Sequence, residues 1–194
     1  MREFLLSLVA ASSLVAAAPA TAQTLRVNPN LVIDVTGFNG DASTLPSAVS
    51  NVETLSGGRV AAIAYNDVAG TPGYGVIILT QGSNVRFDRL DNPNSKAVEI
   101  SQRSLEPWMS NWRNQRRAAV VATAKVSLAD AIRTAEASED GAPAVVAGVA
   151  RSASNPTSDV HAYMIGILKN GDLRRVAVDS QTGAVIANPS ALTI

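Results

Sequence analysis

The feature that most constrains this chain is an apolar helical pattern that occurs twice, about 83 residues apart. Apolar side chains recur at the i, i+3, i+4 and i+7 spacing that marks one face of an amphipathic helix. The pattern follows Ser43 and Thr44 in the first half and Ser127 in the second. The apolar positions are Leu45, Ala48, Val49 and Val52 in the first copy and Leu128, Ala131, Ile132 and Ala135 in the second. The spacing predicts one structural unit present in two copies.

Residues that are typical of helix ends lie at the boundaries of both predicted helices. Ser127 and Asp130 form a capping pair, whose side chains satisfy amide groups that the first helical turn leaves free. Gly57 ends the first helix, and Gly141 and Pro143 end the second.

Each predicted helix is followed by short runs rich in Val, Ile and Ala, which predict an antiparallel meander of about four strands. Asn170-Gly171 is a strong signal for a tight hairpin, because both central residues of such a turn need positive φ. The expected strands are 59–66, 74–80, 85–91 and 97–100 in the first unit and 144–151, 163–169, 173–179 and 184–187 in the second. The fold class is therefore α+β, with one helix packed on the sheet of each unit.

Residues 1–22 are typical of a secretory signal peptide. Arg2 supplies the positive end, an apolar run of 15 residues follows at 4–18, and Ala20-Thr21-Ala22 fits a cleavage site. A membrane span needs about 20 apolar residues. We therefore expect a soluble periplasmic or secreted protein, with no stable membrane insertion after cleavage, although a retained N-terminal anchor stays open.

These signals divide the chain into four segments. The signal peptide covers 1–22, a first unit 23–100, a connecting helix 101–125 and a second unit 126–194. Residues 31–35 predict one further strand, whose place in a sheet the sequence does not give.

The connecting segment carries the candidate partner-binding residues. Pro107 is suited to a helix start, and the two tryptophans that follow lie one helical turn apart. Tryptophan and arginine are enriched at the energetic centres of protein interfaces. The candidates are Trp108, Trp112, Arg113, Arg116 and Arg117. Packing of the tryptophans against the sheet is the alternative.

Composition excludes several classes of function. The chain has 16 basic and 16 acidic residues, one His and no Cys. A balanced charge argues against nucleic-acid binding, and the lack of Cys removes disulfides, thiolate metal sites and cysteine nucleophiles. We expect no cofactor and no metal.

The remaining polar signals favour structural roles. Asp159 and His161 would supply two metal ligands where a closed site needs about four, and Ser158 lacks the context of a nucleophile. His161 is therefore predicted to be exposed at a strand start. Asp91 and Asp179 each open a turn, where a carboxylate accepts backbone N–H bonds.

The acidic run Glu136, Glu139 and Asp140 is predicted to be the solvated end of a helix. It lacks the spacing of a calcium-binding loop.

The second unit resembles the PepSY domain, a small α+β module of secreted bacterial proteins and of some metalloprotease propeptides. The resemblance rests on VSLADAIRTAE at Val126–Glu136, the strand at 163–169, and VDSQTGAVI at Val178–Ile186. The last segment matches the family's ending at Asp179, Thr182, Gly183 and Val185. The first unit departs from it, because Asn94-Ser95 stands where Thr-Gly is expected. The resemblance implies restraint or assistance of a peptidase, and it implies no catalytic residue or cofactor.

Three functions follow. The first is a non-enzymatic envelope protein that binds a polypeptide partner, modulating or inhibiting an extracytoplasmic peptidase. Besides the connecting helix, unpaired sheet edges offer a surface, because they can accept an extended peptide. The alternative is a small-ligand or metal-binding protein that uses a groove between the two units. The third is an enzyme, disfavoured by the absence of a nucleophile motif. The sequence does not give the oligomeric state.

Overall fold

The computed structural model describes residues 24–28, 31–35, 38, 40, 44–68, 71–79, 85–90, 112–152, 154 and 160–193. Within them the fold is α+β, with three α-helices, one short 3-10 helix and three antiparallel sheets, of seven, two and two strands. The helices are α1 (Thr44–Ser56), α2 (Trp112–Thr123), α3 (Leu128–Ser138) and η1 (Pro189–Ala191). The strands are β1 (Thr24–Asn28), β2 (Leu31–Asp34), β3 (Arg59–Val68), β4 (Thr71–Leu79), β5 (Val85–Leu90), β6 (Ala144–Val149), β7 (Arg151–Ser152), β8 (Ala162–Lys169), β9 (Asp172–Asp179), β10 (Val185–Ile186) and β11 (Leu192–Thr193).

Seven strands form one sheet in the order β10-β9-β8-β6-β3-β4-β5, and every neighbouring pair is antiparallel. The two halves of the chain share this sheet because β3 pairs with β6, placing residues 62–64 opposite residues 146–148. The strand expected at 97–100 lies outside the described residues.

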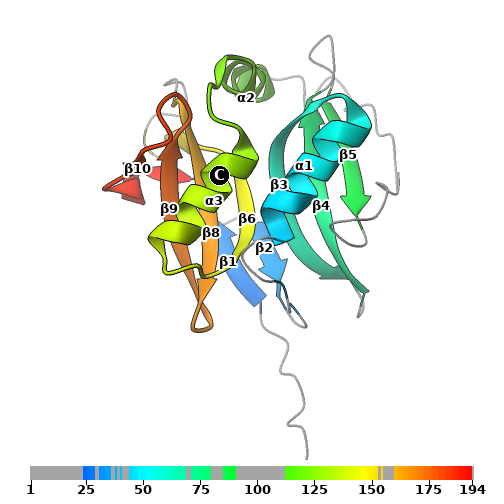
Figure 1. Ribbon diagram of the computed structural model, residues 1–194, viewed down its shortest axis with the longest axis vertical. Coiled ribbons are helices and arrows are strands. Elements are labelled where there is room, and N and C mark those ends of the chain that lie inside the picture. The colour runs from blue at the N-terminus through cyan, green and yellow to red at the C-terminus, as the bar shows by residue number, and fades with distance from the viewer. Residues whose placement is uncertain are drawn as a thin grey trace, which may run out of the picture.

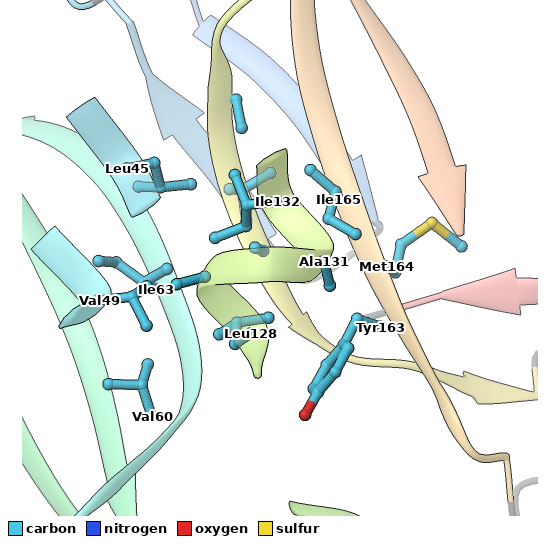
Figure 2. Packing of buried hydrophobic residues seen from close by; sticks show 14 of the residues in the cluster. Leu45, Val49, Val60, Ile63, Leu128, Ala131, Ile132, Tyr163, Met164 and Ile165 are labelled. Carbon is cyan, nitrogen blue, oxygen red and sulfur yellow. The ribbon is translucent and has the colours of Figure 1, made fainter. Parts of the chain in front are cut away.

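Helices α1 and α3 lie side by side on one face of the sheet (Figure 1). Their apolar stripes are the predicted ones, and all eight of those side chains are buried. Leu45 and Val49 from α1 and Leu128 and Ile132 from α3 point toward β3, β6 and β8 (Figure 2). The period of the sequence thus predicted the face of each helix that forms the core.

The local signals at the ends of the elements are also confirmed. Ser127 caps α3, since its Oγ accepts a hydrogen bond from Asp130 N at 3.0 Å. Gly57 and Gly141 follow their helices with φ of 64° and 77°. Asn170 and Gly171 have φ of 56° and 84°, the positive values that the two-residue hairpin between β8 and β9 requires.

Two elements differ from the sequence expectation. The strand expected at 31–35 is β2, and it pairs with β1, which was not predicted. Figure 1 draws this hairpin behind the sheet, on the face opposite α1 and α3. The strand expected at 144–151 is divided at Ala150, after which β7 pairs with β11 in a separate small sheet. The connecting helix is described as α2 from Trp112 to Thr123, and 101–111 lie outside the described residues.

A carboxylate near the end of each packed helix holds the start of the next strand. Glu53 Oε1 accepts a hydrogen bond from Val60 N, and Glu136 Oε1 accepts one from Ala144 N, both at 2.9 Å. A buried backbone N–H without an acceptor would be destabilising. The two carboxylates therefore fix the same step from helix to strand in both halves.

The expectation of a solvated acidic run was wrong for Glu136, which is only 4% exposed. It is buried because the first amide of β6 needs an acceptor beneath α3. Glu139 and Asp140 instead flank Lys169, whose Nζ lies 3.1 Å and 2.8 Å from their carboxylate oxygens. These two contacts raise the pKa of Lys169 and lower that of Asp140.

We expect Glu136→Ala to lower the free energy of unfolding by about 1–3 kcal/mol, because it leaves the buried Ala144 N–H without an acceptor. Glu53→Ala should cost less, since the Glu53 side chain is 21% exposed and water can replace it. Urea unfolding measures both. Glu136→Gln keeps an acceptor oxygen and is the control. Equal losses for the two alanine variants would contradict the prediction.

We expect Gly166→Ala to destabilise the sheet by about 1–3 kcal/mol through overpacking. A Cβ on Gly166 would lie 2.6 Å from Val146 Cγ1 and 3.0 Å from Leu173 Cδ1. Gly75→Ala in β4 is the matched control, because a Cβ there meets nothing within 4 Å. Thermal unfolding of both variants checks this. Unchanged stability of Gly166→Ala would contradict the prediction and would show that β6 and β9 shift to accept the added methyl group without loss of stability.

Candidate functional site

The partner-binding residues predicted from the sequence fall on α2 or before it. Trp112, Arg113, Arg116 and Arg117 lie in α2, but their side chains are outside the described part of the structure, as is all of Trp108. The assignment of these five residues to a partner surface therefore stays a prediction.

Asp179 has the structural role that its position predicted. Its Oδ1 accepts hydrogen bonds from Gln181 N and Thr182 N, both at 2.8 Å. Gly183 completes the turn with φ of 77° and donates its N–H to Asp179 O. The two backbone amides are the main reason that the pKa of Asp179 lies below its ordinary value. Asp91 lies outside the described residues.

This turn holds the segment that leads into α3. Ser180 O accepts hydrogen bonds from Lys125 N and Val126 N, both at 3.0 Å. On the other side of the segment, Tyr163 Oη donates to Val126 O at 3.1 Å. Burial raises the pKa of Tyr163 to about 12, so its hydroxyl remains a donor at neutral pH. Ser180 and Tyr163 thus fix the segment that leads into α3.

His161 is exposed directly before β8, as predicted, and its backbone O accepts a hydrogen bond from Ser180 N. Ser158 and Asp159 lie outside the described residues. No group of three or more His, Cys, Asp or Glu in the described part of the chain could hold a metal ion.

The outer edge of β9 is open along its first half, and this edge is the candidate functional site. The strand beyond it, β10, is two residues long and pairs only with Ala177 and Val178. Among the described residues, 172–176 have β8 on one side and no strand on the other, although the short helix η1, which follows β10, also contacts β9. Figure 1 shows β9 near one end of the sheet, with β10 beside its last residues.

Two hydrogen bonds at the end of β9 give the direction of its backbone groups. Ser180 N donates to His161 O, on the β8 side, and Asp179 N donates to Ala184 O, on the outer side. Backbone groups alternate in direction along an antiparallel strand, and the register of β9 with β8 has no bulge. Leu173 and Arg175 therefore direct their N–H and C=O outward, at the open edge.

Two arginines flank these backbone groups. Arg174 and Arg175 are both exposed, and as successive strand residues they project from opposite faces of the sheet. Within the part of the chain that the structure describes, neither forms an ion pair or a side-chain hydrogen bond. The nearby carboxylates Glu139 and Asp140 are already paired with Lys169. Asp172, also exposed, carries the one negative charge of the 172–176 segment, so the edge combines unpaired backbone groups with a net positive charge.

Sequence reasoning named sheet edges as a possible surface but could not select one. The Arg174-Arg175 pair is visible in the sequence, but its place at an edge depends on the strand order and on the shortness of β10. The other end of the sheet is β5, where the side chains of 85–89 and the segment after Leu90 lie outside the described residues.

The junction between the two halves contains packed side chains in its described part. Leu45 and Val49 of α1 and Leu128 and Ile132 of α3 are each at most 1% exposed. Figure 2 shows them converging between the two helices and the sheet. No observation there favours a small-ligand site.

Comparison with known proteins adds little. No family model matches the chain, and no curated protein matches its sequence. Among solved structures, the fold is similar to the crystal structure of a "putative lipoprotein" from Clostridium difficile 630, with a TM-score of 0.45 and 15% identity, over 77% of this chain and 93% of that one. A likeness at this level carries no argument about function. None of the described helices is long and apolar enough to cross a membrane.

We expect Asp179→Asn to lower the free energy of unfolding at pH 7 by about 1 kcal/mol, a value reduced for the partial exposure of the carboxylate. The pKa of Asp179 is lower in the folded protein than its ordinary 3.8. Its stabilisation is therefore present above the unfolded pKa and is lost as the pH falls through the folded pKa. The difference in the free energy of unfolding between the original protein and Asp179→Asn should therefore be smaller at about pH 3 than at pH 7.

Urea unfolding at the two pH values measures this effect. Asp172→Asn, an exposed aspartate at the other end of the same strand, is the matched control and should change little. A stability difference for Asp179→Asn that is the same at both pH values would show that the turn does not depend on the charge.

Proposed function

We propose that this is a non-enzymatic protein of the bacterial envelope that binds a polypeptide partner. The observation that carries the proposal is the open edge of β9, where the backbone groups of Leu173 and Arg175 have no strand partner among the described residues. Such an edge is a template for an added strand. The leader at 1–22 supports a periplasmic or secreted location.

We also propose that the chain contains two PepSY-like units, the second closer to the family than the first. The corresponding carboxylates Glu53 and Glu136 support this, because each accepts a hydrogen bond from one of the first two amides of the strand that follows its helix. So does the order of elements, since α1 precedes β3, β4 and β5 while α3 precedes β6, β8, β9 and β10.

The partner class that the resemblance suggests is an extracytoplasmic peptidase, which the protein would modulate or inhibit. The PepSY-like turn at Asp179 supports a scaffold role for the motif, since the Asp179 carboxylate closes the turn and Ser180 O holds the segment before α3. Recognition then falls to surfaces outside the motif, of which the β9 edge and α2 are the candidates.

The test is affinity capture from the native envelope fraction with residues 23–194, followed by binding and peptidase assays with each purified candidate. We expect a retained polypeptide that binds again in purified form and whose activity changes when it is a peptidase. Trp108→Ala with Trp112→Ala tests the α2 surface separately from the edge. An empty column under mild conditions would overturn the proposal of a stable polypeptide partner.

A further inference from the structure

We propose that the open edge of β9, residues 172–176, takes an extended acidic strand whose carboxylates face Arg174 and Arg175. This inference rests on the proposed polypeptide binding and names the chemistry of the partner. The added strand would lie beside the half of β9 that β10 leaves unpaired. Its backbone would pair with the outward N–H and C=O of Leu173 and Arg175.

Charge selects the kind of strand that this edge accepts. A strand paired with β9 places one of its residues opposite Arg174 and the next opposite Arg175, on the other face of the sheet. Two successive acidic residues would therefore each meet a guanidinium that has no ion-pair partner among the described residues. Opposite charges directly across a strand pair stabilise it, and like charges destabilise it. The arginines thus favour acidic segments and disfavour basic ones.

The same charges oppose some registers in which this edge could pair with a second copy of the chain, although a register centred on Leu173 would place Asp172 opposite Arg174. An antiparallel pairing of β9 with itself that is centred on Arg174 or on Arg175 places one guanidinium against its own copy. Edge arginines also deter nonspecific pairing with uncharged strands. A heterologous acidic segment is the occupant that the edge fits best.

The rim of the site is partly apolar. Val185 on β10 is 45% exposed and lies across from Val178. Leu173 is half-buried against Gly166 and the core on one face of β9. A bound strand with β-branched residues beside its acidic pair would cover these side chains as well as the backbone.

The experiment uses a labelled peptide of about eight residues, Thr and Val with two adjacent central Glu residues, and measures its binding to the protein by fluorescence anisotropy. We expect saturable binding that weakens from about 0.05 M to 0.5 M salt. Hydrogen exchange should slow at the Leu173 and Arg175 amides when the peptide is bound. A matched peptide with two central Lys residues should not bind.

Arg174→Glu with Arg175→Glu should weaken binding of the acidic peptide at least about tenfold and create binding of the Lys peptide. Lys125→Glu with Arg133→Glu makes the same change of net charge at two exposed positions away from the edge and is the control. It should leave the acidic peptide bound. An acidic peptide with N-methyl groups on successive central amides should fail to bind, because it then lacks backbone donors on both of its edges.

Several results would overturn the inference. These are failure of the acidic peptide to bind, equal binding of the N-methylated peptide, or equal loss in the control variant. A dimer that forms through β9, seen as a concentration-dependent mass abolished by the edge variant, would replace the acidic strand with a second copy. If the variant with Arg174→Glu and Arg175→Glu still captures an envelope polypeptide, this inference is overturned but the proposed function is not. If the affinity column retains no polypeptide at all, the proposed function itself is overturned.

Discussion

The antiparallel pairing of β3 with β6 is the constraint on which the rest of the structure depends. It joins two short meanders into one seven-stranded sheet and removes the two inner edges that separate sheets would expose. It also sets β6 between strands on both sides, where all six of its residues are buried. Helices α1 and α3 then share one face of a single sheet, and β10 and β5 are its two outer strands.

Polar contacts secure this core where helices lead into or out of the sheet. Glu53 and Glu136 accept the first amides of the strands that follow their helices. Ser180 O and Tyr163 Oη fix the segment before α3 from two sides. Each contact gives a partner to a backbone group that is buried or partly buried. The apolar packing sets the layers, and these hydrogen bonds set the positions of the helices within them.

Local patterns predicted the local structure well. The 3.6-residue period predicted the buried faces of α1 and α3, and Asn170-Gly171 predicted the hairpin turn, because each signal acts within one element. Burial of Glu136 was missed because it depends on an amide eight residues away, beyond α3. The shared sheet and the open β9 edge were missed because pairing between distant strands leaves no local signature. The candidate site is a property of strand order, so sequence reasoning could name its chemistry only in general terms.

The alternation along β9 has one more consequence. In a strand, the face on which a side chain lies and the side to which its backbone groups point are coupled, so both reverse together at each residue. Val176 and Val178 are buried beneath the helices. Their burial therefore dictates that Leu173 and Arg175 direct their N–H and C=O away from β8. A one-residue shift in the register of β9 that turned these groups inward would also expose both valines. The hydrophobic core therefore fixes the pattern of backbone donors and acceptors at the outer edge of β9.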